Sequence, residues 1–253
     1  MRVQGSWTPV EMTRANGRGP IVLVCEHASP VIPPQFDGLG LNPEAAGSHA
    51  AWDIGALQVA QALSAALDAP LVAGGISRLV YDLNRPLEAR DAIPERSEVY
   101  AVPGNCGLSE AERQARFEQI HEPFHAALAE VLDGRETAAL VTIHSFTPIY
   151  RGVPRDVEIG YLFHENSAMA DAALLAERMQ GRYRAALNEP YGPQDGVTYT
   201  LKKHGEARGI PSLMIEVRND LVATRDTARA MAAHLFPSIE AGLEAVATPK
   251  AAE

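Results

Sequence analysis

The chain has 253 residues, 46% of them hydrophobic and 21% charged, and its formal net charge is −10 at pH 7. This length and composition predict a single globular domain over residues 1–253, with residues 1–20 and 248–253 at its periphery. The acidic charge, without a segregated basic face, argues against nucleic-acid binding, and no apolar run approaches the ~18 to 20 residues that a membrane span requires.

The first half of the chain alternates strand-like and helix-like patterns. Unbroken apolar runs predict buried strands at 21–26 and near 70–73, and residues 78–82 predict a further extended piece. Residues 42–67 predict a helix, because an Asn-Pro-Glu sequence supplies its N-cap and first turn. Residues 86–107 are rich in proline and glycine without a sustained period, which predicts a long loop of the kind that is usually functional or mobile.

The second half continues the alternation. Ser109 and Glu112 form a capping-box pattern that opens a helix, and an Asp-Gly pair ends it near residue 133. Further strands are predicted at 139–144, 157–163 and 212–217, further helices at 168–187 and 226–246, and a loop at 188–197. Strands that alternate with helices predict an α/β fold with a mixed, mostly parallel sheet covered by helices on both faces.

Two of the predicted strands end in a histidine, His27 and His144. Ligands of α/β proteins bind beyond the carboxyl ends of the strands, and a catalytic zinc takes three nitrogen or oxygen ligands and keeps one position open. The third ligand is Glu26 or Asp53. Neighbouring strand residues point to opposite faces, so Glu26 and His27 share an ion only if the backbone turns sharply between them. The pattern therefore predicts one zinc ion per chain, with the choice between Asp53 and Glu26 open.

A second histidine pair, His121 and His125, matches the short H-E-x-x-H pattern of helical zinc sites. Pro123 lies inside the motif, where it removes a backbone donor and bends the helix. No third-ligand pattern follows at helical spacing. We interpret the motif as a chance match and expect at most a pocket-lining role for one of these histidines.

Arginines and an asparagine cluster in the segment from Ser77 to Pro86. The planar fork of arginine binds carboxylates through two hydrogen bonds, and asparagine adds a neutral one. Arg78, Asn84, Arg85 and the more distant Arg218 thus predict a pocket for a substrate carboxylate. The alternative is a salt-bridged strand end, in which Asp82 only holds one of the arginines.

Glu216 closes the apolar run of the strand at 212–217. Because burial raises the pKa of a carboxylate, Glu216 is the predicted general base, and a structural pair with Arg218 or Lys202 is the alternative. A serine esterase is disfavoured, because neither Ser29 nor Ser145 lies in a Gly-x-Ser-x-Gly elbow.

The two cysteines, Cys25 and Cys106, are far apart in sequence and form no Cys-x-x-Cys pair. They predict neither a disulfide framework nor a thiolate zinc site. The first residues contain no apolar core of signal-peptide length. We therefore expect a reducing compartment, the cytoplasm.

Five segments carry a resemblance to a known family: Val24–Pro33, His49–Ala56, Ser77–Pro86, Thr142–Ser145 and Ile215–Asp220. With these segments in this order, the chain resembles the N-formylglutamate amidohydrolase family. The Asp-x-Asn-Arg-Pro sequence at 82–86 is the most specific part of the resemblance. The resemblance implies a single-domain fold similar to the zinc carboxypeptidases and the phosphorylase/hydrolase class, with a sheet of about eight strands between helices. It also implies hydrolysis of an amide bond on an acidic amino acid.

Carried over to this sequence, the resemblance assigns a role to each predicted site residue. It implies His27, His144 and Asp53 or else Glu26 as metal ligands, Arg78, Asn84 and Arg85 at the substrate carboxylate, and Glu216 as the base. Arg78 would also stabilise the oxyanion, since fixed positive charge aimed at developing negative charge is a large catalytic effect. The expected partner is a small acidic amide.

The chain departs from the family at its first histidine. It carries Glu-His-Ala-Ser where formylglutamate-specific members carry Pro-His-Ser-Gly, which leaves the acyl group and the amino acid open. Two other functions remain as alternatives. One is a non-catalytic protein that binds a small carboxylate, and the other is a peptidase similar to the zinc carboxypeptidases.

Overall fold

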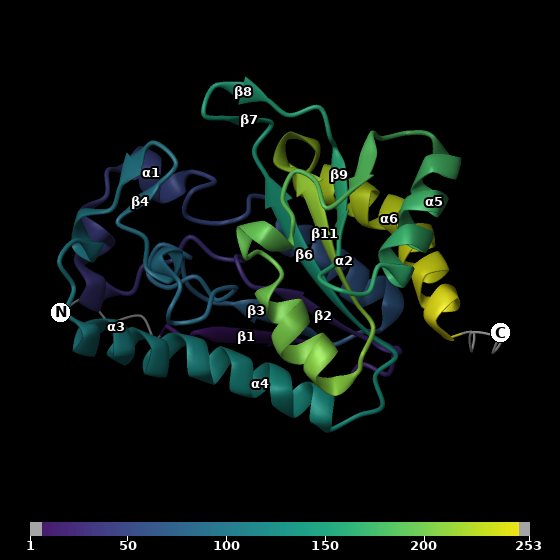
Figure 1. Cartoon of the computed structure of the whole chain (residues 1–253), viewed down its shortest axis with the longest axis horizontal. Coiled ribbons are helices and arrows are strands. Elements are labelled where there is room, and N and C mark those ends of the chain that lie inside the picture. The colour runs from purple at the N-terminus through teal and green to yellow at the C-terminus, as the bar shows by residue number, and fades with distance from the viewer. Residues whose placement is uncertain (1–6, 248–253) are drawn as a thin grey trace.

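A central sheet of seven strands runs through the computed structural model, which describes residues 7–247 (Figure 1). Its strands, in spatial order, are β1 (Val10–Thr13), β3 (Leu71–Gly74), β2 (Ile21–Cys25), β6 (Ala139–Phe146), β11 (Ser212–Arg218), β9 (Ile159–Leu162) and β10 (Ala185–Leu187). Strands β3, β2, β6 and β11 are parallel neighbours. At the two sides of the sheet β1 is antiparallel to β3 and β9 is antiparallel to β11, while β10 is parallel to β9. The predicted mixed, mostly parallel sheet is confirmed, with seven strands in the described part instead of about eight.

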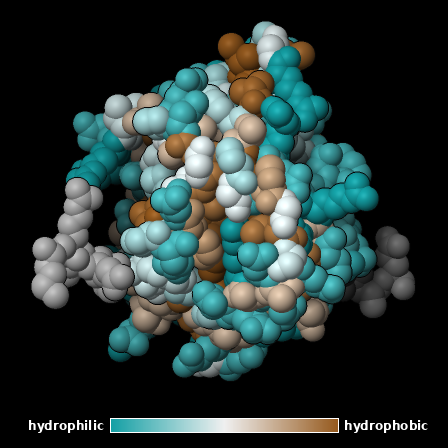
Figure 2. Space-filling view, turned by 90° about the vertical axis from the view of Figure 1, so that its left-hand side faces the viewer, coloured by the Kyte–Doolittle hydropathy of each residue, from teal (hydrophilic) through white to brown (hydrophobic). Residues whose placement is uncertain are grey.

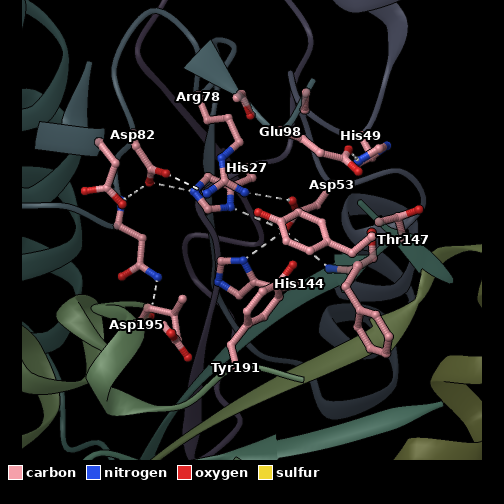
Figure 3. A pocket seen from close by; sticks show the side chains of 18 of the residues that line it. His27, His49, Asp53, Arg78, Asp82, Glu98, His144, Thr147, Tyr191 and Asp195 are labelled. Carbon is pink, nitrogen blue, oxygen red and sulfur yellow. Dashed lines mark hydrogen bonds and ion pairs between the residues drawn. The ribbon is translucent and has the colours of Figure 1, made fainter. Parts of the chain in front are cut away.

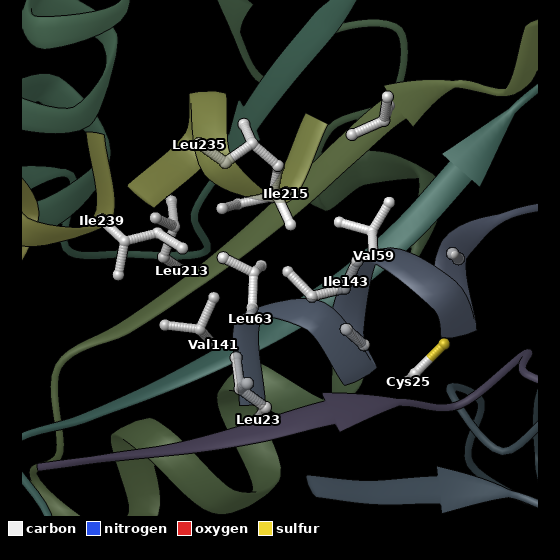
Figure 4. Packing of buried hydrophobic residues seen from close by; sticks show 14 of the residues in the cluster. Leu23, Cys25, Val59, Leu63, Val141, Ile143, Leu213, Ile215, Leu235 and Ile239 are labelled. Carbon is white, nitrogen blue, oxygen red and sulfur yellow. The ribbon is translucent and has the colours of Figure 1, made fainter. Parts of the chain in front are cut away.

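One face of the sheet packs against three helices, α2 (Ala56–Leu67), α5 (Ala168–Gln180) and α6 (Arg225–Ala247). Every residue of β2 and β6 is buried, and alternate side chains such as Val141 and Ile143 meet Leu63 of α2 (Figure 4). Each such aliphatic side chain contributes roughly 1.5–3 kcal/mol by leaving water. This packing explains why the strands read as unbroken apolar runs.

The opposite face packs against α4 (Glu122–Asp133), which runs along the bottom of Figure 1, and against the loops that precede it. Val22 and Val24 belong there to one apolar cluster with Phe124 and Leu128. The predicted capping box at Ser109 is present and opens α3 (Glu110–Arg116), which continues into α4 through a π-helical turn, Phe117–His121. The helix predicted from residue 109 to 133 is confirmed.

The helix predicted over residues 42–67 is wrong in its middle. Asn42 does cap a short helix, α1 (Pro43–Gly47), but the chain then leaves helical geometry until α2 begins at Ala56. Gly55 has φ +84°, and a Cβ built on it would lie 2.4 Å from the carbonyl oxygen of Val222. The break matters because it takes residues 48–55 out of the helix and onto the edge of the sheet.

Three further predictions differ from the structure. The extended piece at 78–82 is a turn, in which a carboxylate oxygen of Asp82 accepts a hydrogen bond from the backbone N–H of Asn84 at 2.9 Å. The helix predicted to reach residue 187 ends at Gln180, because Gly181 adopts φ +68°, and the chain then forms the edge strand β10. The lead-in expected at the periphery contributes β1, while residues 1–6 and 248–253 lie outside the described part of the chain.

The long segment 86–107 is mostly irregular, as predicted, and contains only a two-stranded hairpin and single helical turns. These are η2 (Arg90–Ala92), β4 (Arg96–Ser97), β5 (Tyr100–Ala101) and η3 (Pro103–Asn105). Short helical segments elsewhere are η1 (Pro34–Gly40), which is kinked, η5 (Pro193–Asp195), η6 (Leu201–Gly205), η7 (Glu206–Arg208) and η8 (Asn219–Leu221).

A second hairpin, β7 (Ile149–Tyr150) and β8 (Val153–Pro154), projects from the top of the molecule in Figure 1. Its side chains Ile149 and Val153 are exposed, and hydrophobic colour gathers at the top of Figure 2, where the hairpin projects. No helix within residues 7–247 is long and apolar enough to cross a membrane.

Candidate metal and substrate site

A cavity of about 610 Å³ opens beyond the carboxyl ends of β2, β6 and β11 (Figure 3). Its wall includes His27, Asp53, His144 and Glu216, together with residues of both hairpins. A sheet covered on both faces leaves this edge as the open place for ligands. The cavity therefore brings most of the predicted site residues together from segments far apart in sequence, whereas Glu26 and Arg218 do not line it.

Strand register places three of these side chains in a row. Glu216 on β11 is the direct partner of His144 on β6, and continuing the pairing of Val24 with Thr142 brings Glu26 beside His144 on the other side. Oε2 of Glu26 lies 3.0 Å from Nε2 of His144. Directly opposed residues share a face of the sheet, so all three point away from α2 and α6.

Asp53 joins the two strand-end histidines (Figure 3). Its Oδ2 lies 2.9 Å from Nδ1 of His144 and 3.3 Å from Nδ1 of His27, and its backbone N–H donates to the carbonyl oxygen of His27 at 2.9 Å. All three side chains are buried, and one ligand atom from each lies within 4.8 Å of the others. Asp53, between the imidazoles, is better placed as a common ligand than Glu26, which faces the other nitrogen of His144. Another group that could hold an ion, His164, Glu165 and Glu206, is partly exposed and lies outside this cavity.

A second carboxylate holds the outer nitrogen of His27. Nε2 of His27 lies 2.7 Å from Oδ1 of Asp82, and Nη2 of Arg78 donates to Oδ2 of Asp82 at 2.6 Å. Burial raises the pKa of Asp82, but the charges of Arg78 and His27 outweigh it and lower the pKa well below the ordinary value. Asp53 behaves in the same way, because His27 and His144 lower its pKa despite burial.

The pKa values of the two imidazoles shift in the opposite direction, upward. Burial lowers the pKa of His144, but the charge of Glu26 and the hydrogen bond that His144 donates to Asp53 raise it well above the ordinary value. For His27, burial and Arg78 lower the pKa, and Asp82 and Asp53 together raise it above the ordinary value. The neighbouring carboxylates thus favour the protonated form of both imidazoles.

Asn84 and Arg85 line the cavity, but their polar atoms are occupied within the wall. The Asn84 amide donates to the carbonyl oxygen of Val197 and accepts from the backbone N–H of Thr200. Arg85 pairs with Asp91 at 2.7 Å and donates to the carbonyl oxygens of Asn84, Asp195 and Gly196. Both side chains thus hold the 195–200 segment against the cavity.

Arg78 and Arg218 differ in their position. The Arg78 side chain is 28% exposed toward the cavity and also lies 3.5 Å from Asp53. Arg218 is not part of the cavity wall, and its guanidinium pairs with Glu158 and Asp220. The structure therefore does not bring Arg218 together with the other predicted carboxylate-binding residues.

Glu216 is buried and faces the cavity, and its Oε2 has no hydrogen-bond partner among the described residues. Burial raises its pKa to about 7, with Asp53 adding to the effect and His144 opposing it. Within residues 7–247 neither Arg218 nor Lys202 forms an ion pair with it. A carboxylate with such a pKa is suited to exchange protons near neutral pH.

The second histidine pair lies elsewhere, at the π-helical turn and the start of α4. His125 contacts His204 at 2.8 Å and the carbonyl oxygen of Leu83, and His121 contacts the hydroxyl of Tyr199. Neither belongs to the cavity wall or to a group able to hold an ion.

Sequence reasoning missed several wall residues, among them Arg155 and Tyr191. Both lie in segments without a regular pattern, so no periodicity marks them. Their position depends on the hairpin and the loop that fold over the sheet edge.

Comparisons with known proteins agree with this arrangement. The family model of N-formylglutamate amidohydrolases matches residues 19–223, whereas no curated protein matches. The crystal structure of a gene product from Agrobacterium tumefaciens is 44% identical, with a TM-score of 0.91 over 95% of this chain and 97% of that one. N-formylglutamate amidohydrolase from Ralstonia eutropha has the same fold, at 19% identity and a TM-score of 0.72 over 94% of this chain and 98% of that one. Because the family match includes both strand-end histidines and Glu216, and extends over most of the sequence, the chain belongs to the N-formylglutamate amidohydrolase family.

Proposed function

We propose that this protein is a zinc-dependent hydrolase that cleaves the amide bond of an N-acyl acidic amino acid of the N-formyl type. The observation that carries the proposal is the buried group His27, Asp53 and His144 beside Glu216 in one cavity. Membership of the amidohydrolase family supports the reaction class.

The residues present fit a catalytic zinc ion. Two imidazole nitrogens and one carboxylate oxygen are a common ligand set, and the cavity leaves a further position open. Each histidine also has a carboxylate beside its other nitrogen, Glu26 at 3.0 Å from His144 and Asp82 at 2.7 Å from His27. Such outer carboxylates fix the orientation of metal-binding imidazoles and raise their basicity. We therefore assign Asp53 as the third ligand and Glu26 as the residue that orients His144.

A zinc ion bound there supplies a Lewis acid for the substrate carbonyl and lowers the pKa of water. Glu216, with a pKa near 7, accepts the proton of the attacking water and returns it to the leaving nitrogen. Arg78 stays protonated beside Asp82 and Asp53 and faces the cavity, where it stabilises the developing oxyanion. Asn84 and Arg85 shape the wall that receives the substrate.

The metal is tested by elemental analysis of protein purified without chelator. About one zinc per chain is expected, lost in His27→Ala and kept in His121→Ala, a buried histidine outside the cavity. Absence of metal from active wild-type protein would overturn the assignment. Absence of metal and activity together, with a small carboxylate still bound, would favour the non-catalytic alternative.

The reaction is tested with a panel of N-formyl, N-acetyl and N-succinyl amino acids on the zinc-loaded protein. Release of the free amino acid from an acidic N-acyl substrate is expected, and Glu216→Gln should abolish it while zinc stays bound. Release of carboxyl-terminal residues from peptides, with no cleavage of the panel, would favour a peptidase instead.

A further inference from the structure

We infer that Arg155 determines specificity in this site by binding a second carboxylate of the substrate, on its amino-acid side chain. The inference rests on the proposed function of the same cavity and names the residue that selects a dicarboxylate. Arg155 follows the hairpin β7–β8 and forms part of the cavity wall with Glu216, Asp53 and Arg78.

Aromatic rings hold the Arg155 guanidinium in place. Its Cζ lies 4.5 Å from the ring centre of Tyr150, 4.7 Å from that of Tyr191 and 5.6 Å from that of Phe146. A guanidinium over an aromatic face is attracted by the ring, and several rings together restrict the rotamers of a long side chain. The cation is thus positioned before any ligand arrives.

Most of the hydrogen-bond donors of Arg155 have no acceptor in the described part of the chain. Nη1 donates to the hydroxyl of Tyr191 at 2.9 Å and toward the carbonyl oxygen of Thr147 at 3.5 Å. A guanidinium has five N–H groups, and within residues 7–247 Nε and Nη2 have no hydrogen-bond acceptor. These two nitrogens form one edge of the fork, which matches the two oxygens of a carboxylate.

Within residues 7–247 Arg155 also lacks an acidic partner, unlike two other arginines of the wall. Arg78 pairs with Asp82 and Asp53, and Arg85 pairs with Asp91. No carboxylate of the described residues forms an ion pair with Arg155 within 4.0 Å. The wall therefore holds a preformed positive charge without its counter-charge.

The positive charge of Arg155 acts on one nearby acidic group, Glu98, because Arg155 helps to lower the pKa of the Glu98 carboxylate. The Glu98 carboxylate is already occupied, however, by His49 at 2.6 Å and by the backbone N–H of Arg151 at 2.9 Å. Arg151 and Arg96 line the cavity as well, but both are exposed to water. An incoming carboxylate thus meets the half-buried Arg155 as the positioned donor.

Tyr191 connects Arg155 to the reacting end of the cavity (Figure 3). Burial and the charge of Glu216 raise the Tyr191 pKa, while Arg155 and Arg78 oppose this effect, so its hydroxyl lies within electrostatic reach of all three. A carboxylate on Arg155 and an amide beside Glu216 can therefore belong to one small molecule. A volume of about 610 Å³ suits a ligand of this size.

The test compares N-formylglutamate with N-formylglutamine, which differ only in the charge of the side-chain end. Arg155→Met should lower kcat/KM for the carboxylate substrate by about 10- to 100-fold, the effect of losing a charged hydrogen bond. The same variant should leave kcat/KM for the amide substrate within about threefold of the wild type. Arg155→Lys, which keeps the charge without the fork, should restore part of the preference. Arg184→Met removes an arginine whose side chain is 65% exposed outside the cavity, and it is the matched control.

Binding of glutarate and its monoamide, measured by calorimetry on the same proteins, gives a readout apart from catalysis. Wild type and Arg184→Met should bind glutarate more tightly than the monoamide, and Arg155→Met should lose this difference. An unchanged substrate ratio, or an equal loss for both compounds as a purely structural role would cause, overturns the inference. If wild type cleaves neither amide, the proposed function fails, and the calorimetric comparison alone decides for or against Arg155.

Discussion

The buried histidine cluster at the start of α4 makes a quantitative prediction about acid stability. His121 is 1% exposed, stacks on Phe117 with ring centres 4.5 Å apart, and has no partner for its Nδ1 among the described residues. Burial and the nearby charge of Lys203 lower its pKa from the usual 6.5 to about 3. A proton on this ring is therefore favourable in the unfolded chain and unfavourable in the folded one.

The sign and size of this pH effect on stability follow from the difference in bound protons between the unfolded and the folded chain. Between about pH 3 and pH 6.5 the unfolded chain binds one proton more at this residue, so stability is fully present above pH 6.5 and is lost as the pH falls. The slope is about 1.4 kcal/mol per pH unit, and the loss at pH 5 amounts to about 2 kcal/mol. His204, whose pKa is lowered to about 4, contributes in the same direction.

Replacing His121 by glutamine removes the titrating group and keeps a polar partner for Tyr199. Urea unfolding from about pH 5 to pH 7.5, followed by circular dichroism with chelator present, should show a pH dependence weaker by about 2 kcal/mol than that of wild type. Tyr199→Phe is the control, because it removes the 3.1 Å contact and leaves the imidazole in place. Equal pH dependence in His121→Gln and wild type would refute the reasoning.

Other predictions concern the metal site, the base and the core. Asp53→Asn should lose zinc, whereas Glu26→Gln should keep zinc with about 10- to 100-fold weaker affinity in a competition titration. Equal losses of zinc affinity in the two variants would contradict the different roles of Asp53 and Glu26. Glu216→Gln should lower kcat by about 10²- to 10⁴-fold in steady-state assays, and a normal kcat would remove Glu216 as the base. Leu63→Ala, at a fully buried position of α2, should lower the free energy of unfolding in urea by about 2–5 kcal/mol. A loss below about 1 kcal/mol would mean that this part of the core repacks.

The strands and the two strand-end histidines could be predicted because their information is local. An unbroken apolar run marks a strand that is covered on both faces, and a polar residue at its end marks the sheet edge. His27, His144 and Glu216 all carry this signal, and the structure brings all three to one cavity.

The rest of the site depends on contacts that sequence patterns do not contain. Asp53 reaches the histidines because the chain leaves helical geometry after Gly47 and re-enters it at Ala56, in a segment whose composition favours helix. Arg78 and Asp82 meet His27 through a turn held by side-chain hydrogen bonds, not through the extended piece that their apolar neighbours predict. Each of these positions results from tertiary packing that overrides local propensity.

The row of Glu26, His144 and Glu216 has a consequence for how this protein tolerates changes in chain length. Three adjacent strands set the row through their backbone pairing, so a slip of one residue in β6 would turn His144 into the core and bring Ile143 to its place. Deletions or insertions within β2, β6 or β11 are therefore far more damaging than those before the strands begin. The turn after Gly134, where the chain enters β6 at the opposite edge of the sheet, is the place to graft a tag or a loop without disturbing the site.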